Sequence, residues 1–138
     1  MRSITSVVFC FLSTLILTMA EPEAFVGKWK LIETYDEQFQ VVELPTGDFT
    51  WIIQPDESTE NVLNVFIKVG NSMRSTITFV DEAEQGDIVT LGSLMSTMMM
   101  PAEPLFRLET YLSSTLPKMT LVQKQEVDGT TRMILSGL

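Results

Sequence analysis

Carboxylates are the side chains in this sequence with the widest choice of chemistry, and they gather in two clusters. The clusters are Asp56, Glu57 and Glu60, and then Asp81, Glu82, Glu84 and Asp87. Carboxylates can bind Ca²⁺ or can work in pairs to hydrolyse glycosides. Neither cluster has the Asp-x-Asp-x-Asp-Gly spacing of a calcium loop, and the surrounding sequence marks no pair as buried. We therefore interpret both clusters as solvated turns.

Other catalytic and cofactor-binding groups are scarce. The 138-residue chain has no histidine, which removes Ser-His-Asp and Cys-His catalysis and most zinc and copper sites. No glycine-rich phosphate loop follows an apolar run. Eighteen acids face nine basic residues, and a net charge of −9 disfavours binding to a phosphate backbone. We predict that the protein is not an enzyme, needs no metal or cofactor, and does not bind nucleic acid.

The first twenty residues have the pattern of a secretory signal peptide. Arg2 gives a positive start, the stretch Ile4–Met19 is almost purely apolar and small, and no acid occurs before Glu21. A small residue, Ala20, completes a cleavage site. An uncleaved membrane anchor is the alternative, but the stretch is short for a spanning helix, which needs about 20 residues. We predict cleavage after Ala20 and a secreted protein.

Cleavage would divide the chain into a signal peptide, residues 1–20, and a single domain, residues 21–138. Because Arg2 would be lost, the net charge would change from −9 to −10. The only cysteine, Cys10, lies in the signal peptide, so the domain would have no disulfide and would depend on its core for stability. We expect no stable membrane insertion after cleavage.

The rest of the chain is rich in strand-forming residues, with turn signals at short intervals. The strand-like runs are Val41–Leu44, Phe49–Ile53, Val62–Val69, Arg74–Val80, Ile88–Leu91, Leu105–Leu112, Met119–Glu126 and Thr130–Leu135. Asp128-Gly129 predicts a type I′ hairpin, because both central positions of that turn need a positive φ. The best helical candidate, Asp36–Val42, is short and could equally be a strand.

Two of these runs alternate between apolar and polar residues. Leu63, Val65, Ile67 and Val69 share one face of the first, and Ser75, Ile77 and Phe79 share one face of the second. A strand with one apolar and one mixed face fits a sheet that curls around an interior. We predict an all-β fold: an antiparallel up-and-down barrel of about eight to ten strands, with little or no helix beyond the signal peptide. A β-sandwich is the competing architecture.

Two stretches resemble a known family. Phe25-Val26-Gly27-Lys28-Trp29-Lys30-Leu31 resembles the opening strand of the calycin superfamily, which holds the fatty-acid-binding proteins and the lipocalins and begins with Gly-x-Trp. The end of the chain resembles the last hairpin of the fatty-acid-binding proteins, which carries a Thr-Arg-x-Tyr type of motif. The segments that carry this resemblance are Lys118–Gln125, Asp128-Gly129 and Thr130-Thr131-Arg132. At both ends of the chain the similarity is closer to the fatty-acid-binding proteins.

The resemblance implies a barrel around a cavity that holds a fatty acid or another small hydrophobic molecule. It implies that Arg132 binds the ligand carboxylate, although the tyrosine of the motif is replaced by Ile134. Arg107 is a second candidate for the same role. Lipocalins pack the late arginine on the first-strand tryptophan instead, so Arg132 could support Trp29, and a fully exposed Arg132 is a third possibility. Gly27 and Trp29 would close one end of the barrel.

The sequence departs from each subfamily at one point. Only the stretch from Asp36 to Leu44 separates the opening strand from the Pro45 turn, which leaves no room for the two helices of fatty-acid-binding proteins. Lipocalins lack those helices and are secreted, but they usually carry a disulfide. The subfamily therefore stays open.

Our hypothesis is a secreted carrier of a fatty acid or similar lipid. Its ligand-binding candidates are Arg132, Arg107, Ile134, Phe66, Phe79 and Met98. Met98 belongs to a methionine-rich stretch that could line a pocket or its mouth, or else be buried in the core. The alternative is a secreted protein-interaction module whose barrel is filled by its own side chains. A continuous apolar cavity of about 300 Å³ or more favours the carrier, and a filled interior favours the module.

Overall fold

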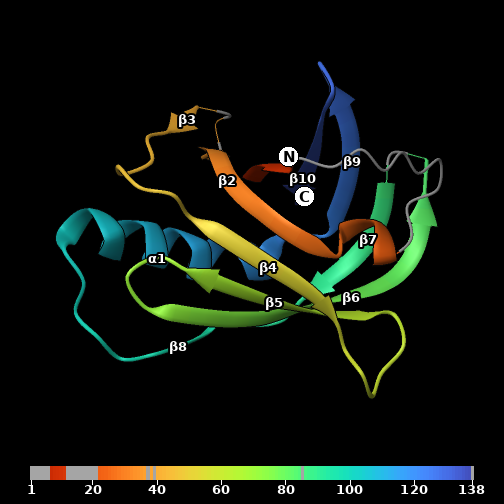
Figure 1. Ribbon diagram of the computed structural model, residues 1–138, viewed down its shortest axis with the longest axis horizontal. Helices are drawn as coiled ribbons and strands as arrows, with labels where there is room; N and C mark the ends of the chain where they lie inside the picture. Colours follow the sequence, from red (N-terminus) through yellow and green to blue (C-terminus); the bar gives the residue numbers. More distant parts are fainter. Residues whose placement is uncertain (1–6, 12–21, 37, 39, 85, 138) are drawn as a thin grey trace.

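The structure is a computed structural model that describes residues 7–11, 22–36, 38, 40–84 and 86–137. Its strands are β1 (Val7–Phe11), β2 (Gly27–Tyr35), β3 (Val41–Val42), β4 (Thr50–Pro55), β5 (Val62–Lys68), β6 (Ser72–Ala83), β7 (Gly86–Leu91), β8 (Met95–Ser96), β9 (Leu121–Val127) and β10 (Thr130–Ser136). Its helices are the 3₁₀ turns η1 (Pro22–Phe25) and η2 (Leu116–Lys118) and the α-helix α1 (Glu103–Thr115). Figure 1 shows the sheet curling around an interior, which confirms the predicted all-β, barrel-like fold.

The strands form one antiparallel sheet in the order β1-β10-β9-β7-β6-β5-β4-β2-β3, and short β8 pairs with β6. β1 pairs with β10 on one side and with β2 on the other, so the sheet closes on itself. Val7, for example, lies opposite both Leu135 and Thr34. The predicted barrel therefore closes through a strand that belongs to the predicted signal peptide.

The predicted signal peptide is only partly described. Its described part, Val7–Phe11, is a strand, and residues 1–6 and 12–20 lie outside the described residues. Cleavage after Ala20 stays a prediction. Among the described helices, none has the length and apolar character needed to cross a membrane.

Local sequence signals explain most of the strands. Leu63, Val65 and Ile67 are at most 2% exposed on one face of β5, as their alternation predicts. The β9–β10 turn has φ of 51° at Asp128 and 77° at Gly129, which confirms the predicted hairpin with two positive φ values.

The prediction of a strand at Leu105–Leu112 is wrong, because this run is part of the 13-residue helix α1. Pro104 sits in the first turn, where a missing N–H costs nothing. Leu108 and Leu112, four residues apart, lie on one face of the helix and are at most 4% exposed. The other helical candidate, Asp36–Val42, is not a helix where it is described: β3 occupies its end, and the Asp36 carboxylate accepts hydrogen bonds from two nearby backbone N–H groups.

Different elements lie at the two ends of the barrel. At the first, which we call the α1 end, the Tyr111 hydroxyl on α1 donates to the Tyr35 carbonyl at the end of β2, 2.6 Å away. At the opposite end, which we call the η1 end, η1 leads into the start of β2. There the Trp29 Nε1 donates to the Phe25 carbonyl at 2.8 Å, and the Phe25 ring stacks on Phe79 with ring centres 5.8 Å apart. α1 and η1 therefore lie at opposite ends of β2.

Candidate functional site

The interior of the barrel is densely occupied by side chains. Its largest fully buried residues are Trp29, Trp51, Phe25, Ile53, Leu63, Ile67, Met73, Ile77, Leu112, Leu116 and Met119. They come from the sheet, from α1 and from both 3₁₀ turns, and they belong to one core cluster. They form the hydrophobic core of the described part of the chain.

The described part of the chain has surface pockets that are open to solvent, and three of them have a size of interest. One of about 400 Å³ lies at the η1 end, and one of about 460 Å³ lies on the outer face of β5 and β6. The third, of about 430 Å³, lies between α1 and the segment that joins β3 to β4. Their size suits small ligands or the side chains of a partner.

The proposed carboxylate anchor does not face the barrel interior. Met133 and Leu135 of β10 are fully buried, and Arg132 and Ile134 alternate with them on the other face, where both are half-buried. Trp29 is only 1% exposed and belongs to the inner core. The structure therefore does not bring Arg132 onto the face that Trp29 occupies.

The remaining predicted site residues are dispersed over the molecule. Phe66 lies half-buried on the outer face of β5, Phe79 stacks on Phe25 at the η1 end, and Met98 is 99% exposed. Arg107 lies on the solvent side of α1 and pairs with Glu103 one turn earlier. Gly27 begins β2 with a φ of 144°, and Trp29, two residues later, is buried in the core. That the two residues close one end of the barrel stays a prediction.

A buried carboxylate holds α1 to the turn between β5 and β6. Glu109, 7% exposed, accepts from the backbone N–H of Gly70 at 2.9 Å, from the N–H of Asn71 at 2.6 Å and from Asn71 Nδ2 at 2.7 Å. A Cβ on Gly70 would come within 2.4 Å of the Pro101 Cβ, so only glycine fits this approach. We call this arrangement the Glu109 clamp. The sequence offers little indication of this role for Glu109, because a single acid among leucines is common.

The clamp also anchors a methionine-rich stretch. Asn71 Oδ1 accepts from the Met99 N–H at 2.8 Å and from Thr97 Oγ1 at 2.9 Å. The segment from Met95 to Met100, the Met-rich segment, nevertheless exposes its apolar side chains. Met95 is 66%, Met98 99%, Met99 60% and Met100 88% exposed. Burial in the core, one of the two interpretations of this stretch, is therefore wrong.

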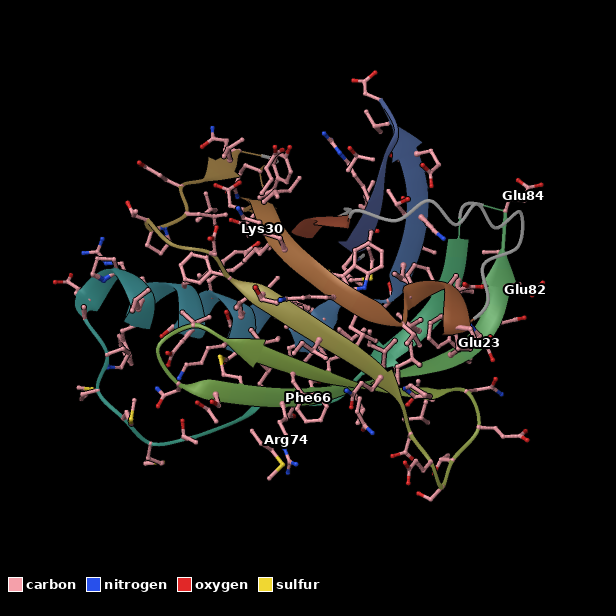
Figure 2. All side chains as sticks on the ribbon, in the orientation of Figure 1. Glu23, Lys30, Phe66, Arg74, Glu82 and Glu84 are labelled. Carbon is pink, nitrogen blue, oxygen red and sulfur yellow. The ribbon has the colours of Figure 1, made fainter. Side chains whose placement is uncertain are left out.

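A groove on the outer face of β5 and β6 adjoins the Met-rich segment. Phe66 lies opposite Arg74 in the β5–β6 register, and Arg74 lies opposite Met95 of β8. Figure 2 shows Phe66 and Arg74 extending from the same side of the sheet. All three residues line the groove of about 460 Å³. An aromatic ring, a guanidinium and an exposed methionine thus lie side by side, and these residue types are enriched in protein interfaces.

The groove beside α1 has a different character. Val42, Leu44 and Leu108 supply apolar walls, and Arg107 and Tyr111 supply polar groups. Burial is the main cause that raises the pKa of the Tyr111 phenol to about 12. The Tyr111 hydroxyl is therefore a neutral donor over the physiological range.

The two acidic clusters have different environments. Asp56 in the first cluster is solvated and accepts from Asn64 Nδ2 and Ser58 Oγ, which lowers the pKa of its carboxyl. In the second cluster Asp87 is only 3% exposed, so the interpretation as a solvated turn is wrong for Asp87. Its alternation with Val89 and Leu91 on β7 places it on the inner face, and that spacing could have identified it from the sequence. Over the described residues, no group of three or more acids or cysteines is arranged to hold a metal ion.

Comparison with known proteins gives no relative. No protein-family model, curated protein or solved structure matches the chain. The resemblance of the two chain ends to the calycins stays a prediction.

Proposed function

We propose that the protein is a secreted β-barrel module that binds another protein through the Met-rich segment and the adjoining β5–β6 groove, without catalysis. The observation that carries this proposal is the contrast between inside and outside. The barrel interior is packed with fully buried side chains, while four methionines at 60–99% exposure extend into solvent. Exposed apolar residues of this density mark interaction sites, and methionine adapts its shape to a partner.

The surrounding charges indicate the chemistry of the partner. Although the chain has a net charge of −9, the side chains that flank the Met-rich segment include Lys68 and Arg74, both exposed. The Lys68 ammonium donates to the Gly70 carbonyl, next to the Glu109 clamp. A partner surface with an apolar centre and a carboxylate at its rim would complement this arrangement.

Site-specific photo-crosslinking tests the proposal. A photoreactive residue is placed at position 98 of the full chain and, as a control, at position 41, where Val41 is a similarly exposed apolar residue (65%) on β3. We expect position 98 to crosslink one extracellular protein that position 41 does not. The double substitution Met98→Ser and Met100→Ser should then weaken binding to that protein by at least about tenfold, and Val41→Ser should not. Equal binding by the two variants would exclude the Met-rich segment as the interface.

A second candidate is the carrier function, now located in the groove beside α1 instead of the barrel interior. Its support is the combination of apolar walls with Arg107 in a volume of about 430 Å³. A ligand carboxylate would replace Glu103 on the Arg107 guanidinium. Displacement of a fluorescent fatty acid from the full chain tests this. We expect Arg107→Gln to lower the affinity and Arg74→Gln to leave it unchanged. Failure of lipids to displace the probe would exclude the carrier.

A further inference from the structure

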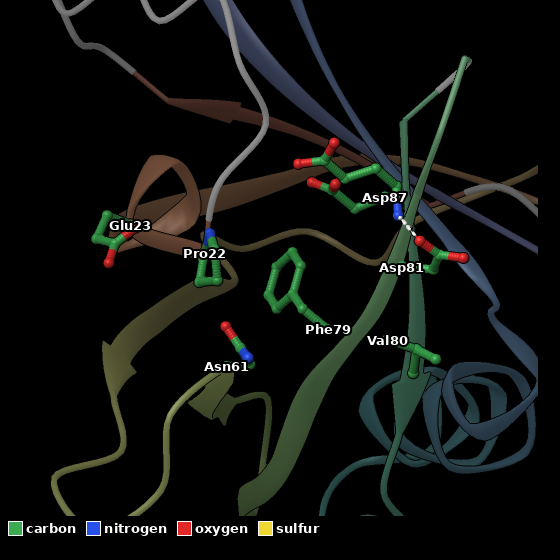
Figure 3. Close-up of a pocket in the computed structure, with 8 residues that line it drawn as sticks. Pro22, Glu23, Asn61, Phe79, Val80, Asp81 and Asp87 are labelled. Atoms are coloured by element: carbon green, nitrogen blue, oxygen red, sulfur yellow. Dashed lines mark hydrogen bonds between the residues drawn. The ribbon is translucent and has the colours of Figure 1, made fainter.

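The pocket at the η1 end is acidic, and nothing in the protein–protein proposal uses it. It lies at the opposite end of the barrel from the Glu109 clamp and has a volume of about 400 Å³. Four of the residues that line it are acids: Glu23, Asp81, Glu82 and Asp87. Phe79 and Pro22 add apolar surface, as Figure 3 shows. Among the described residues that line it, none is basic.

Asp87 is the unusual group in this pocket. It is only 3% exposed, and its Oδ2 has no hydrogen-bond partner. Figure 3 shows Asp87 extending from β7 toward the side of the pocket where Pro22 and Phe79 lie. A buried carboxylate that lacks a partner costs free energy, so a complementary group in the pocket would stabilise it.

A second carboxylate increases the free-energy cost of the charged Asp87 side chain. Glu82 lies directly opposite Asp87 in the β6–β7 register, and like charges in that position repel each other. Burial first, and then the charge of Glu82, raise the pKa of the Asp87 carboxyl. Gly86, next to Asp87, has a φ of +149° and packs its backbone against β9, where a Cβ would come within 2.4 Å of the Val122 carbonyl oxygen. The β6–β7 pairing places Glu82 and Asp87 next to each other.

The apolar wall distinguishes between an inorganic and an organic cation. The described residues offer no set of three ligands suited to a metal ion. Phe79 instead presents an aromatic ring beside the acids, and its stacking on fully buried Phe25 fixes its position. A cation near an aromatic face gains about 0.5–2 kcal/mol, and a carboxylate adds a charge-assisted hydrogen bond.

We propose that this pocket binds an organic ammonium cation, with the ammonium group between Asp87 and Glu82 and its apolar body against Phe79 and Pro22. The site is independent of the Met-rich segment, so the two proposals can fail separately.

Calorimetric titration of the full chain with three matched probes tests the proposal. The probes are 2-phenylethylammonium, the neutral 2-phenylethanol and the anionic 3-phenylpropionate. We expect saturable 1:1 binding of the ammonium probe only. Calcium chloride is titrated separately. Binding of Ca²⁺ in preference to the ammonium probe, or equal binding of the neutral probe, would overturn the proposal.

Variants locate the binding within the pocket. Asp87→Asn keeps the shape of the side chain and should weaken the ammonium probe at least about tenfold. Glu82→Gln, at an exposed position that should not disturb folding, should weaken it by a smaller factor. Glu84→Gln removes an exposed acid of the same hairpin that does not line the pocket, and should have no effect. Unchanged affinity in both Asp87→Asn and Glu82→Gln would refute the assignment.

Discussion

The Glu109 clamp makes a sharp prediction about stability. In Glu109→Ala, three hydrogen bonds to one carboxylate are lost, and the N–H groups of Gly70 and Asn71 lose their acceptor in a largely buried place. Hydrogen bonds to charged groups contribute about 1.5–3 kcal/mol each, but they share one carboxylate whose own burial is costly. We therefore expect the free energy of unfolding to fall by about 3–4 kcal/mol, which is less than their sum. For a chain of this size, the melting temperature should fall by about 10 °C.

The matched control lies on the same helix. Glu103 is also an acid on α1, but its side chain is 72% exposed and its partner Arg107 is 74% exposed. Such a surface pair contributes about 0–1 kcal/mol, so Glu103→Ala should cost less than about 0.5 kcal/mol. The loss in the free energy of unfolding for Glu109→Gln should lie between the losses for Glu109→Ala and Glu103→Ala. The amide oxygen still accepts hydrogen bonds, but the amide NH₂ is a donor and cannot accept from the remaining N–H groups.

Urea unfolding at neutral pH measures all three variants, and hydrogen exchange adds a local measurement. The Met99 N–H bonds to Asn71, which the clamp holds, so its exchange should accelerate in Glu109→Ala and not in Glu103→Ala. If Glu109→Ala cost no more than Glu103→Ala, the Glu109 clamp would not hold α1 to the sheet, and our account of how α1 is attached would be wrong.

Three further predictions concern other sites. Leu112→Ala, at a fully buried core position, should lower the free energy of unfolding by about 2–5 kcal/mol in chemical unfolding. Phe106→Ala, at a residue 48% exposed on the same helix, should lower it by less than about 1 kcal/mol, and similar costs would contradict the packing of α1. Asp87→Asn should stabilise the protein at neutral pH, because the raised pKa of Asp87 means that its charged form is penalised in the folded state; in parallel unfolding curves this gain should vanish as the pH falls through the raised pKa toward 3.8, and a constant gain would contradict it. In a spectrophotometric titration, one tyrosine should ionise near pH 12, and Tyr111→Phe should remove this step; its persistence would show that it belongs to Tyr35.

The sequence predicted the elements whose pattern is set by near neighbours. The period-two alternation along Val62–Val69 correctly separated the inner from the outer residues, because a strand cannot turn single side chains independently. The Asp128-Gly129 turn could be predicted because a positive φ, which both residues adopt, is costly for most other residue types.

Elements whose role is set by distant contacts were missed. The run Leu105–Leu112 is short and rich in large apolar residues, and in the helix that it forms Leu108 and Leu112 pack into the core cluster. Arg132 and Ile134, two residues apart on β10, share one face of the strand. Only the burial of Met133 and Leu135 shows that this face is the outer one. The sequence groups Asp87 with its acidic neighbours. Its inward position could have been predicted, because Asp87 is two residues before Val89 and four before Leu91, and all three lie on the same face of β7.

The pairing of β1 determines how cleavage of the predicted signal peptide would affect the sheet, because β1 is one of the strands that close it. An antiparallel sheet that closes on itself must have an even number of strands, since neighbours alternate in direction. β1 runs antiparallel to both β2 and β10, so β2 and β10 run parallel to each other. The strands β2, β4, β5, β6, β7, β9 and β10 form an odd-numbered set, which β1 makes even. Cleavage after Ala20 would therefore change the topology of the protein as well as its length, because any seam that then joined β2 to β10 would be the one parallel pairing in an otherwise antiparallel barrel.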